Sequence, residues 1–178
     1  EVHGIVAAAE NLPDGDAFRP GDILRTLSGK TVEVISTDAE GRLLLADALT
    51  YAVQQDAHLL IDVATLTGAC AVALGRGGSG LFATDAGARD LLLRAAEEVG
   101  ERVWPLPLWD EYRDLLRSDH ADLKNTAGRW GAAINAALFL REFTAGRPWL
   151  HLDIAGPAWA EQLGPFGPPG ATGHGVRT

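Results

Sequence analysis

Residues 31–64 read TVEVISTDAEGRLLLADALTYAVQQDAHLLIDVA, and three segments in them differ in pattern. Residues 31–35 are rich in β-branched side chains, which favours a strand, and the apolar residues 43–55 favour a helix. Residues 58–64 form a nearly continuous apolar run, which is typical of a strand covered on both faces in a parallel sheet. A strand, a helix and a second strand in this order form a right-handed crossover unit. This stretch therefore predicts an α/β fold.

The rest of the chain continues the alternation of strands and helices. Residues 23–35 are typical of a β-hairpin with a Ser-Gly turn. Thr84 or Asp85 is placed to cap a helix that Gly100 ends. We therefore expect the α/β class, with three α/β/α layers and a mostly parallel sheet. Further strands are expected at residues 2–9, 81–83 and 149–155, an extended segment at 103–109, helices at 86–99, 111–117 and 132–143, and a loop at 121–129.

The composition excludes several classes of function. The formal net charge of −9 argues against nucleic acid and anionic membranes as general partners, since both require a basic face. The single cysteine, Cys70, rules out a disulfide framework, and no apolar run reaches the roughly 18 residues of a transmembrane helix. We therefore expect a cytoplasmic protein. Because the sequence contains no methionine, we also expect it to be a piece of a longer protein.

The polar residues between the first strand and the helix have two interpretations. If the backbone stays extended after the strand, Asp38, Glu40 and Arg42 face the same side. Two anions and one cation on one side are suited to a divalent metal or a polar ligand. Alternatively, Thr37 to Glu40 form a capping box, in which the side chains of Thr37 and Glu40 satisfy backbone N–H groups at the start of the helix.

Three loops are expected at the carboxyl ends of strands, where ligands bind in α/β sheets. They comprise residues 38–42, 65–68 and 155–158. Each loop alone is ordinary, but their joint position at one edge predicts a functional site.

Several motifs together resemble the leucine aminopeptidase (cytosol aminopeptidase) family of two-metal exopeptidases. The most specific are STDAEGRL at residues 36–43, DVATLTGA at 62–69 and HLDIAG at 151–156. The resemblance covers essentially the whole chain, and it implies a peptidase that removes amino-terminal residues from peptides, with a leucine-type preference. It also implies a homohexamer in the full-length protein. The further matching segments are ENLPDG, RPGDILRTLSGKTVEV, ADLKN and ATGHGVRT.

The resemblance assigns roles to individual residues. Asp38 and Glu40 would bind two divalent metal ions, zinc or manganese, with Glu40 bridging them. Arg42 would hold a bicarbonate that acts as the general base, because an arginine stays protonated and cannot itself be the base. The substrate site would be lined by Thr65, Leu66, Gly68, Ala155 and Ala158.

The chain departs from the family pattern in two ways. Ser36 stands where the family often has asparagine. The upstream glycine-rich stretch that supplies a lysine and an aspartate ligand and a catalytic lysine is absent, and Lys30 lies in the hairpin turn. We therefore interpret residues 1–178 as part of a catalytic domain that is inactive alone. The alternative is a non-catalytic α/β module for assembly or binding.

Other residues favour structural roles. Asp62 and Asp153 lie within apolar strands, where we expect them to bind nearby loop backbone. We expect Cys70 to be buried and the glycine-rich residues 75–80 to form a turn. The polar residues Lys124, Asn125 and Arg129 would contact a partner subunit or face water.

Overall fold

The computed structural model describes residues 1–164 and 167–178, and these form two compact units. The first unit comprises Glu1–Leu60 and Trp109–Arg147, and the second comprises Ile61–Leu108 and Pro148–Thr178. Each unit is described by itself. None of the helices in the described ranges combines the length and apolar character that a membrane span needs.

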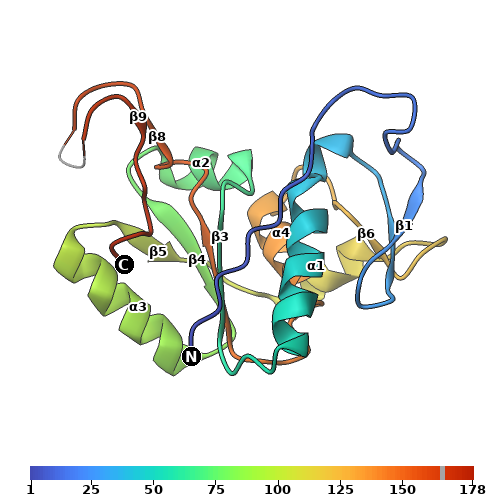
Figure 1. Cartoon of the computed structure of the whole chain (residues 1–178), viewed down its shortest axis with the longest axis horizontal. Helices are drawn as coiled ribbons and strands as arrows, with labels where there is room; N and C mark the ends of the chain where they lie inside the picture. The colour runs from blue at the N-terminus through green and yellow to red at the C-terminus, as the bar shows by residue number, and fades with distance from the viewer. Residues whose placement is uncertain (165–166) are drawn as a thin grey trace. The chain divides into compact units, whose positions relative to one another are not determined.

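A small mixed sheet forms one part of the first unit (Figure 1). Strands β1 (Ile23–Arg25) and β2 (Thr31–Glu33) pair antiparallel and confirm the predicted hairpin. Gly29 has φ +87° in the turn, a conformation that residues with a Cβ rarely adopt. Strand β6 (Leu123–Lys124) pairs parallel with β2 on its other side.

Helices form the other part of the first unit. Helix α4 carries an unbroken buried run from Asn135 to Leu140 and packs against α1 and η2. This burial explains why a helix with so few polar residues forms here. The helical elements are η1 (Thr37–Ala39), α1 (Gly41–Gln54), η2 (Asp110–Leu116) and α4 (Ala132–Arg141), where η denotes a 3-10 helix.

The second unit is built on a four-stranded sheet in the order β3-β7-β4-β5. Strand β4 pairs parallel with β5 and antiparallel with β7, so the sheet is mixed. Every residue of β7 is buried, as its continuous apolar run predicts. The strands are β3 (Leu60–Ala64), β4 (Ser79–Ala83), β5 (Val103–Pro105) and β7 (Trp149–Asp153).

Helix α3 (Ala86–Val99) covers part of this sheet and packs against β4 (Figure 1). The side chain of Asp85 accepts a 2.7 Å hydrogen bond from the Ala88 amide, and Gly100 ends the helix with φ +76°. Both predicted helix ends are therefore confirmed. The core between the helix and the sheet contains Leu81, Leu92, Leu150 and Leu152.

The α/β class is confirmed, but some local expectations are wrong. Residues 2–9 form no strand and are all exposed, since no ladder partner or packed face stabilises them within the described residues. The expected loop at residues 121–129 contains β6, whose two residues are too few to show a strand pattern. The sequence also gave no signal for α2 (Gly68–Leu74) or for the antiparallel pair β8 (Trp159–Ala160) and β9 (Gly170–Ala171).

Candidate functional site

The segment after β2 that runs into the first turn of α1, residues 36–42, is here called the carboxylate loop. It is not extended: residues 37–39 form η1, and Glu40 has φ −76° and ψ −38°. The premise of an extended backbone is therefore wrong, and whether Asp38, Glu40 and Arg42 face the same side stays a prediction. The side chain of Asp38 is exposed and that of Glu40 is half-buried.

The capping-box alternative is also wrong. Ser36 occupies the N-cap of η1 and Glu40 the N-cap of α1, and neither makes a side-chain capping hydrogen bond. The predicted box required Thr37 as the cap, but Thr37 lies inside η1. The carboxylates of Asp38 and Glu40 therefore do not serve as helix caps, which suits hard-oxygen ligands for a divalent cation.

Arg42 lies on the buried side of α1 and is only 6% exposed. Its Nη1 donates a 2.8 Å hydrogen bond to the backbone carbonyl of Asn125. The guanidinium is thus held in a defined orientation, which is a requirement for holding a small anion through paired N–H groups.

Asn125 is a residue that the sequence interpretation placed wrongly. It is fully buried rather than part of a solvent-facing or subunit-facing patch. Its side-chain amide contacts the backbone of the carboxylate loop and of the residue before it. The only signal in the sequence was the position of Asn125 at the end of the ADLKN motif.

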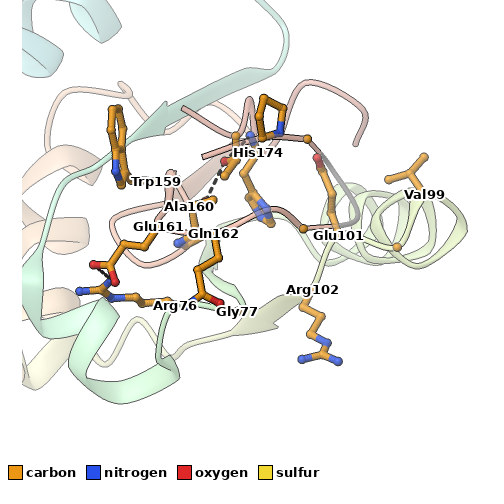
Figure 2. Close-up of a pocket in the computed structure, with 16 residues that line it drawn as sticks. Arg76, Gly77, Val99, Glu101, Arg102, Trp159, Ala160, Glu161, Gln162 and His174 are labelled. Atoms are coloured by element: carbon orange, nitrogen blue, oxygen red, sulfur yellow. Dashed lines mark hydrogen bonds and ion pairs between the residues drawn. The ribbon is translucent and has the colours of Figure 1, made fainter. Parts of the chain in front are cut away.

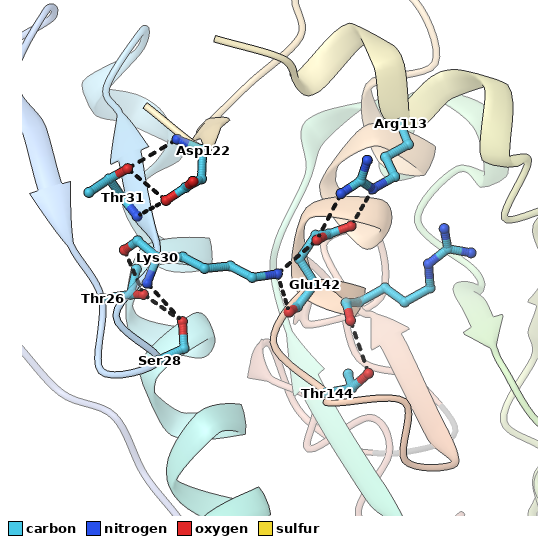
Figure 3. A network of polar contacts seen from close by, with 9 residues as sticks. Thr26, Ser28, Lys30, Thr31, Arg113, Asp122, Glu142 and Thr144 are labelled. Carbon is cyan, nitrogen blue, oxygen red and sulfur yellow. Dashed lines mark hydrogen bonds and ion pairs between the residues drawn. The ribbon is translucent and has the colours of Figure 1, made fainter. Parts of the chain in front are cut away.

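Lys30 belongs to a separate polar network of the first unit (Figure 3). Its Nζ lies 2.8 Å from Oε2 of Glu142 and 2.9 Å from the Glu142 carbonyl oxygen. Arg113 donates from Nε to the same carboxylate over 2.5 Å. The hydrogen bond from Arg113, supported by Lys30, lowers the pKa of Glu142 to about 2. Lys30 therefore has a structural partner, consistent with its place in the hairpin.

In the second unit, Thr67 connects the loop after β3 to helix α2. Its Oγ1 accepts a 3.1 Å hydrogen bond from the Cys70 amide and so caps α2. The same hydroxyl donates over 2.6 Å to Oδ2 of Asp153. The Thr67 hydroxyl therefore both donates and accepts a hydrogen bond, and these two bonds hold the turn that carries Leu66 and Gly68.

The carboxylate of Asp153 joins the two predicted substrate loops of this unit. It is fully buried, and its Oδ1 accepts from the backbone amides of Leu66 at 3.2 Å, Thr67 at 3.3 Å and Ala155 at 3.2 Å. The expectation that Asp153 binds loop backbone is therefore confirmed. It brings the loop with Thr65, Leu66 and Gly68 together with the loop that carries Ala155 and Ala158.

Asp62 differs from this expectation, because its partners are side chains. Its Oδ2 accepts a 2.6 Å hydrogen bond from Nε1 of Trp149, and its Oδ1 lies 2.5 Å from Nδ1 of His151. All three residues lie in the paired strands β3 and β7. The carboxylate therefore satisfies polar atoms inside the sheet and does not reach a loop.

Two glycines allow close approach around these loops. A Cβ at Gly156 would lie 2.2 Å from the carbonyl oxygen of Gly75, and a Cβ at Gly80 would lie 2.7 Å from Sγ of Cys70. Of the glycine-rich residues 75–80, which were expected to form a turn, residues 75–77 do so, whereas Ser79 and Gly80 belong to β4. The turn packs directly against Gly156.

A cavity of about 760 Å³ lies elsewhere in the second unit (Figure 2). It is lined by residues that include Arg102, Trp159 and His174, and an ion pair between Arg76 and Glu161 lies at it. None of the five predicted substrate residues lines this cavity. Burial lowers the pKa of His174, which favours the neutral imidazole.

The predicted site residues therefore fall into two groups. Asp38, Glu40 and Arg42 lie in the first unit, and the five substrate residues lie in the second. Within the described part of the chain, no group of three or more histidine, cysteine, aspartate or glutamate side chains is arranged to hold a metal. The meeting of the two groups at one site stays a prediction.

Comparison with known proteins decides the family. All 178 residues match the family model described as the cytosol aminopeptidase family, catalytic domain. The chain belongs to this family. A probable cytosol aminopeptidase of Geotalea uraniireducens (strain Rf4) is 56% identical over 176 residues, which are 99% of this chain and 36% of the relative. That of Geobacter sulfurreducens has the same identity and coverage. The chain thus spans about a third of the length of these curated relatives.

Two solved structures share the fold of this chain. A mutant of tomato leucine aminopeptidase superimposes with a TM-score of 0.89 at 44% identity, over 96% of this chain and 33% of that chain. The bottromycin maturation enzyme BotP in complex with Mn superimposes with a TM-score of 0.88 at 47% identity, over 95% of this chain and 38% of that chain. These likenesses identify the chain as part of an aminopeptidase fold.

Proposed function

We propose that this chain supplies part of the active site of a two-metal aminopeptidase that removes amino-terminal residues, with a leucine-type preference, from peptides. The observation that carries the proposal is the carboxylate loop, in which Asp38 and Glu40 are not used as helix caps. Family membership and the Mn complex of BotP support the choice of metal chemistry. The cytosol aminopeptidase names of the relatives support a cytoplasmic location.

In this proposal the residues of the carboxylate loop have separate tasks. Asp38 and Glu40 would hold two divalent cations, zinc or manganese, and a Glu40 carboxylate shared between them would reduce their mutual repulsion. Such a pair of cations, when bound, lowers the pKa of a shared water so that hydroxide forms at neutral pH. Arg42 would hold a bicarbonate as the general base, since the guanidinium itself stays protonated and cannot take up a proton.

The loops of the second unit hold the substrate in this proposal. The Leu66 carbonyl accepts from the substrate amine, and Thr65 and Gly68 line the same site. Ala155 and Ala158 shape the pocket for the first side chain. The rigid connection through Asp153 supports this assignment, because it holds both loops in one arrangement.

We further propose that residues 1–178 alone are inactive and that a homohexamer forms in the full-length protein. Two carboxylates leave most coordination positions of two cations to water. The isolated chain with added Zn²⁺ or Mn²⁺ should therefore not hydrolyse leucine p-nitroanilide. Turnover equal to that of a full-length family enzyme, lost in Glu40→Gln, would contradict the proposed inactivity and still support the metal role.

The direct test uses a chimera, in which residues of this chain replace the matching segment of the Geobacter sulfurreducens relative. The chimera should hydrolyse leucine p-nitroanilide in the presence of Mn²⁺, and Glu40→Gln should lower kcat/KM roughly 100-fold or more. Glu98→Gln is the matched control, because Glu98 is an exposed glutamate on α3. Full activity in Glu40→Gln would contradict the proposed function.

A further inference from the structure

We propose that Asn125 is a positioning residue that holds the carboxylate loop and Arg42 in one fixed arrangement. The inference rests on the proposed function of this loop. Asn125 is fully buried in the first unit, and it follows directly after β6. It contacts neither a predicted ligand carboxylate nor a predicted substrate residue in any described hydrogen bond, so it acts through the residues that it holds.

The side-chain amide of Asn125 makes four hydrogen bonds to backbone atoms. Its Oδ1 accepts from the amides of Ile35 at 2.8 Å and Ser36 at 3.3 Å. Its Nδ2 donates to the carbonyls of Ser36 at 2.7 Å and Ala39 at 3.3 Å. All donor and acceptor positions of the amide are occupied, as a buried polar side chain requires.

The contact with Ala39 explains how a remote residue acts on both carboxylates. Ala39 is buried and lies between Asp38 and Glu40 in the sequence. Its carbonyl is bound to Nδ2 of Asn125, so the backbone that joins the two carboxylate residues is held at its middle. Metal ligands require positions fixed within a fraction of an ångström, and η1 is a single short turn that does not provide this alone.

The backbone of Asn125 extends the same arrangement to its neighbours. Its amide donates to the Glu33 carbonyl over 2.9 Å, continuing the parallel pairing of β6 with β2. Its carbonyl accepts from Nη1 of Arg42 over 2.8 Å. One buried residue therefore sets the end of β2, the carboxylate loop and the guanidinium of Arg42 relative to one another.

Other side chains cannot replace the Asn125 amide. Aspartate has the same shape, but a carboxylate oxygen would face the carbonyls of Ser36 and Ala39 and repel them. Alanine would leave two amides and two carbonyls without these partners around a fully buried position. Asparagine alone accepts two hydrogen bonds and donates two from a side chain of this length.

The test compares Asn125→Asp with Asn135→Asp in the chimera. Asn135 is also buried in the first unit, and its Nδ2 donates to the Trp130 carbonyl over 2.9 Å, away from the carboxylate loop. We expect Asn125→Asp to raise the Mn²⁺ concentration for half-maximal activity by about tenfold or more. KM for leucine p-nitroanilide should change less than about threefold, because the substrate loops are untouched.

The control separates positioning from general stability. Asn135→Asp should leave the Mn²⁺ activation constant within about twofold of the value for the unmodified chimera, even if it lowers thermal stability as much as Asn125→Asp does. Equal shifts in both variants, or no shift in Asn125→Asp, would overturn the inference. If the Glu40→Gln chimera retains activity, the proposed function fails. If Glu40→Gln loses activity but Asn125→Asp does not change the Mn²⁺ activation constant, only the positioning role is rejected.

A measurement without a variant covers the case in which Asn125→Asp does not fold. The amides of Ile35 and Ser36 lie outside the helices and strands, yet both donate to Oδ1 of Asn125. Hydrogen exchange of the chimera without further substitution should show both amides protected against exchange. Exchange at the rate of an exposed loop at both amides would overturn the inference.

Discussion

The hydroxyl of Thr67 donates a 2.6 Å hydrogen bond to the buried carboxylate of Asp153, while its oxygen accepts from the first turn of α2. The same carboxylate accepts the Ala155 amide over 3.2 Å. One acid at the end of β7 therefore connects the DVATLTGA and HLDIAG motifs, which are far apart in the sequence. This relationship gives a physical reason for both motifs that is independent of their proposed roles with substrate.

Removing the charge of Asp153 should destabilise the second unit. In Asp153→Asn an NH₂ group replaces one acceptor, so the Thr67 hydroxyl or a loop amide loses its partner inside the protein. We expect the free energy of unfolding to fall by about 2–4 kcal/mol, measured by urea denaturation of the chain. Asp56→Asn is the control, because Asp56 forms an exposed ion pair with Arg147 and should change stability by less than about 1 kcal/mol. Equal effects would contradict this account.

Gly156 should tolerate no side chain. A Cβ there would lie 2.2 Å from the Gly75 carbonyl oxygen and 3.2 Å from that of Gly78, so backbone must move. Gly156→Ala should lower the free energy of unfolding by at least about 3 kcal/mol or prevent folding. A Cβ at Gly15 meets no atom within 4 Å, so Gly15→Ala serves as the control. Unchanged thermal unfolding of Gly156→Ala would show that the two turns do not pack as described.

Glu142 should make stability depend on acidic pH. Its folded pKa of about 2 lies below its ordinary value of 4.5, so the folded state binds the proton less well than the unfolded state. The stabilisation is complete above about pH 4.5 and is lost as the pH falls towards 2. Glu142→Gln should remove about 1–2 kcal/mol at pH 7 and flatten this part of the pH profile, as measured by urea denaturation. A parallel profile for Glu142→Gln and the unmodified chain would contradict the network in Figure 3.

Cys70 should react slowly in the folded chain. Burial, with the nearby charge of Asp153, raises the pKa of its thiol to about 11, and the side chain is only 1% exposed. Since the thiolate is the reactive form, we expect a disulfide reagent at pH 8 to label the folded chain roughly 100-fold more slowly than the urea-unfolded chain. Equal rates in both states would show that α2 opens readily or that Cys70 is not packed under β4.

The sequence predicted elements whose signals are local. The ends of α3 follow from Asp85 and Gly100, and the hairpin follows from two β-branched segments around a Ser-Gly turn. Residues 2–9 showed an apolar pattern, but a strand also requires a partner, which a pattern does not reveal. The conformation of residues 37–40 depends on backbone hydrogen bonds that no side-chain pattern encodes.

The residue types of the candidate site could be predicted from the sequence, but the buried residue whose hydrogen bonds hold the carboxylate loop could not. Asp38 and Glu40 were singled out from their motif. Asn125 was missed because all the hydrogen bonds of its side chain are with backbone atoms 86 to 90 positions earlier in the sequence. Asp153 was recognised because a carboxylate within an apolar strand requires buried partners. A buried asparagine in a polar segment gives no such signal.

The central claim is that the carboxylate loop forms part of a two-metal site, and anomalous diffraction from crystals of the chimera with Mn²⁺ tests it most directly. The account predicts two manganese peaks about 3.5–4 Å apart, with Glu40 bound to both and Asp38 bound to one. Manganese bound only elsewhere, with the Asp38 and Glu40 carboxylates directed away from it, would contradict the claim.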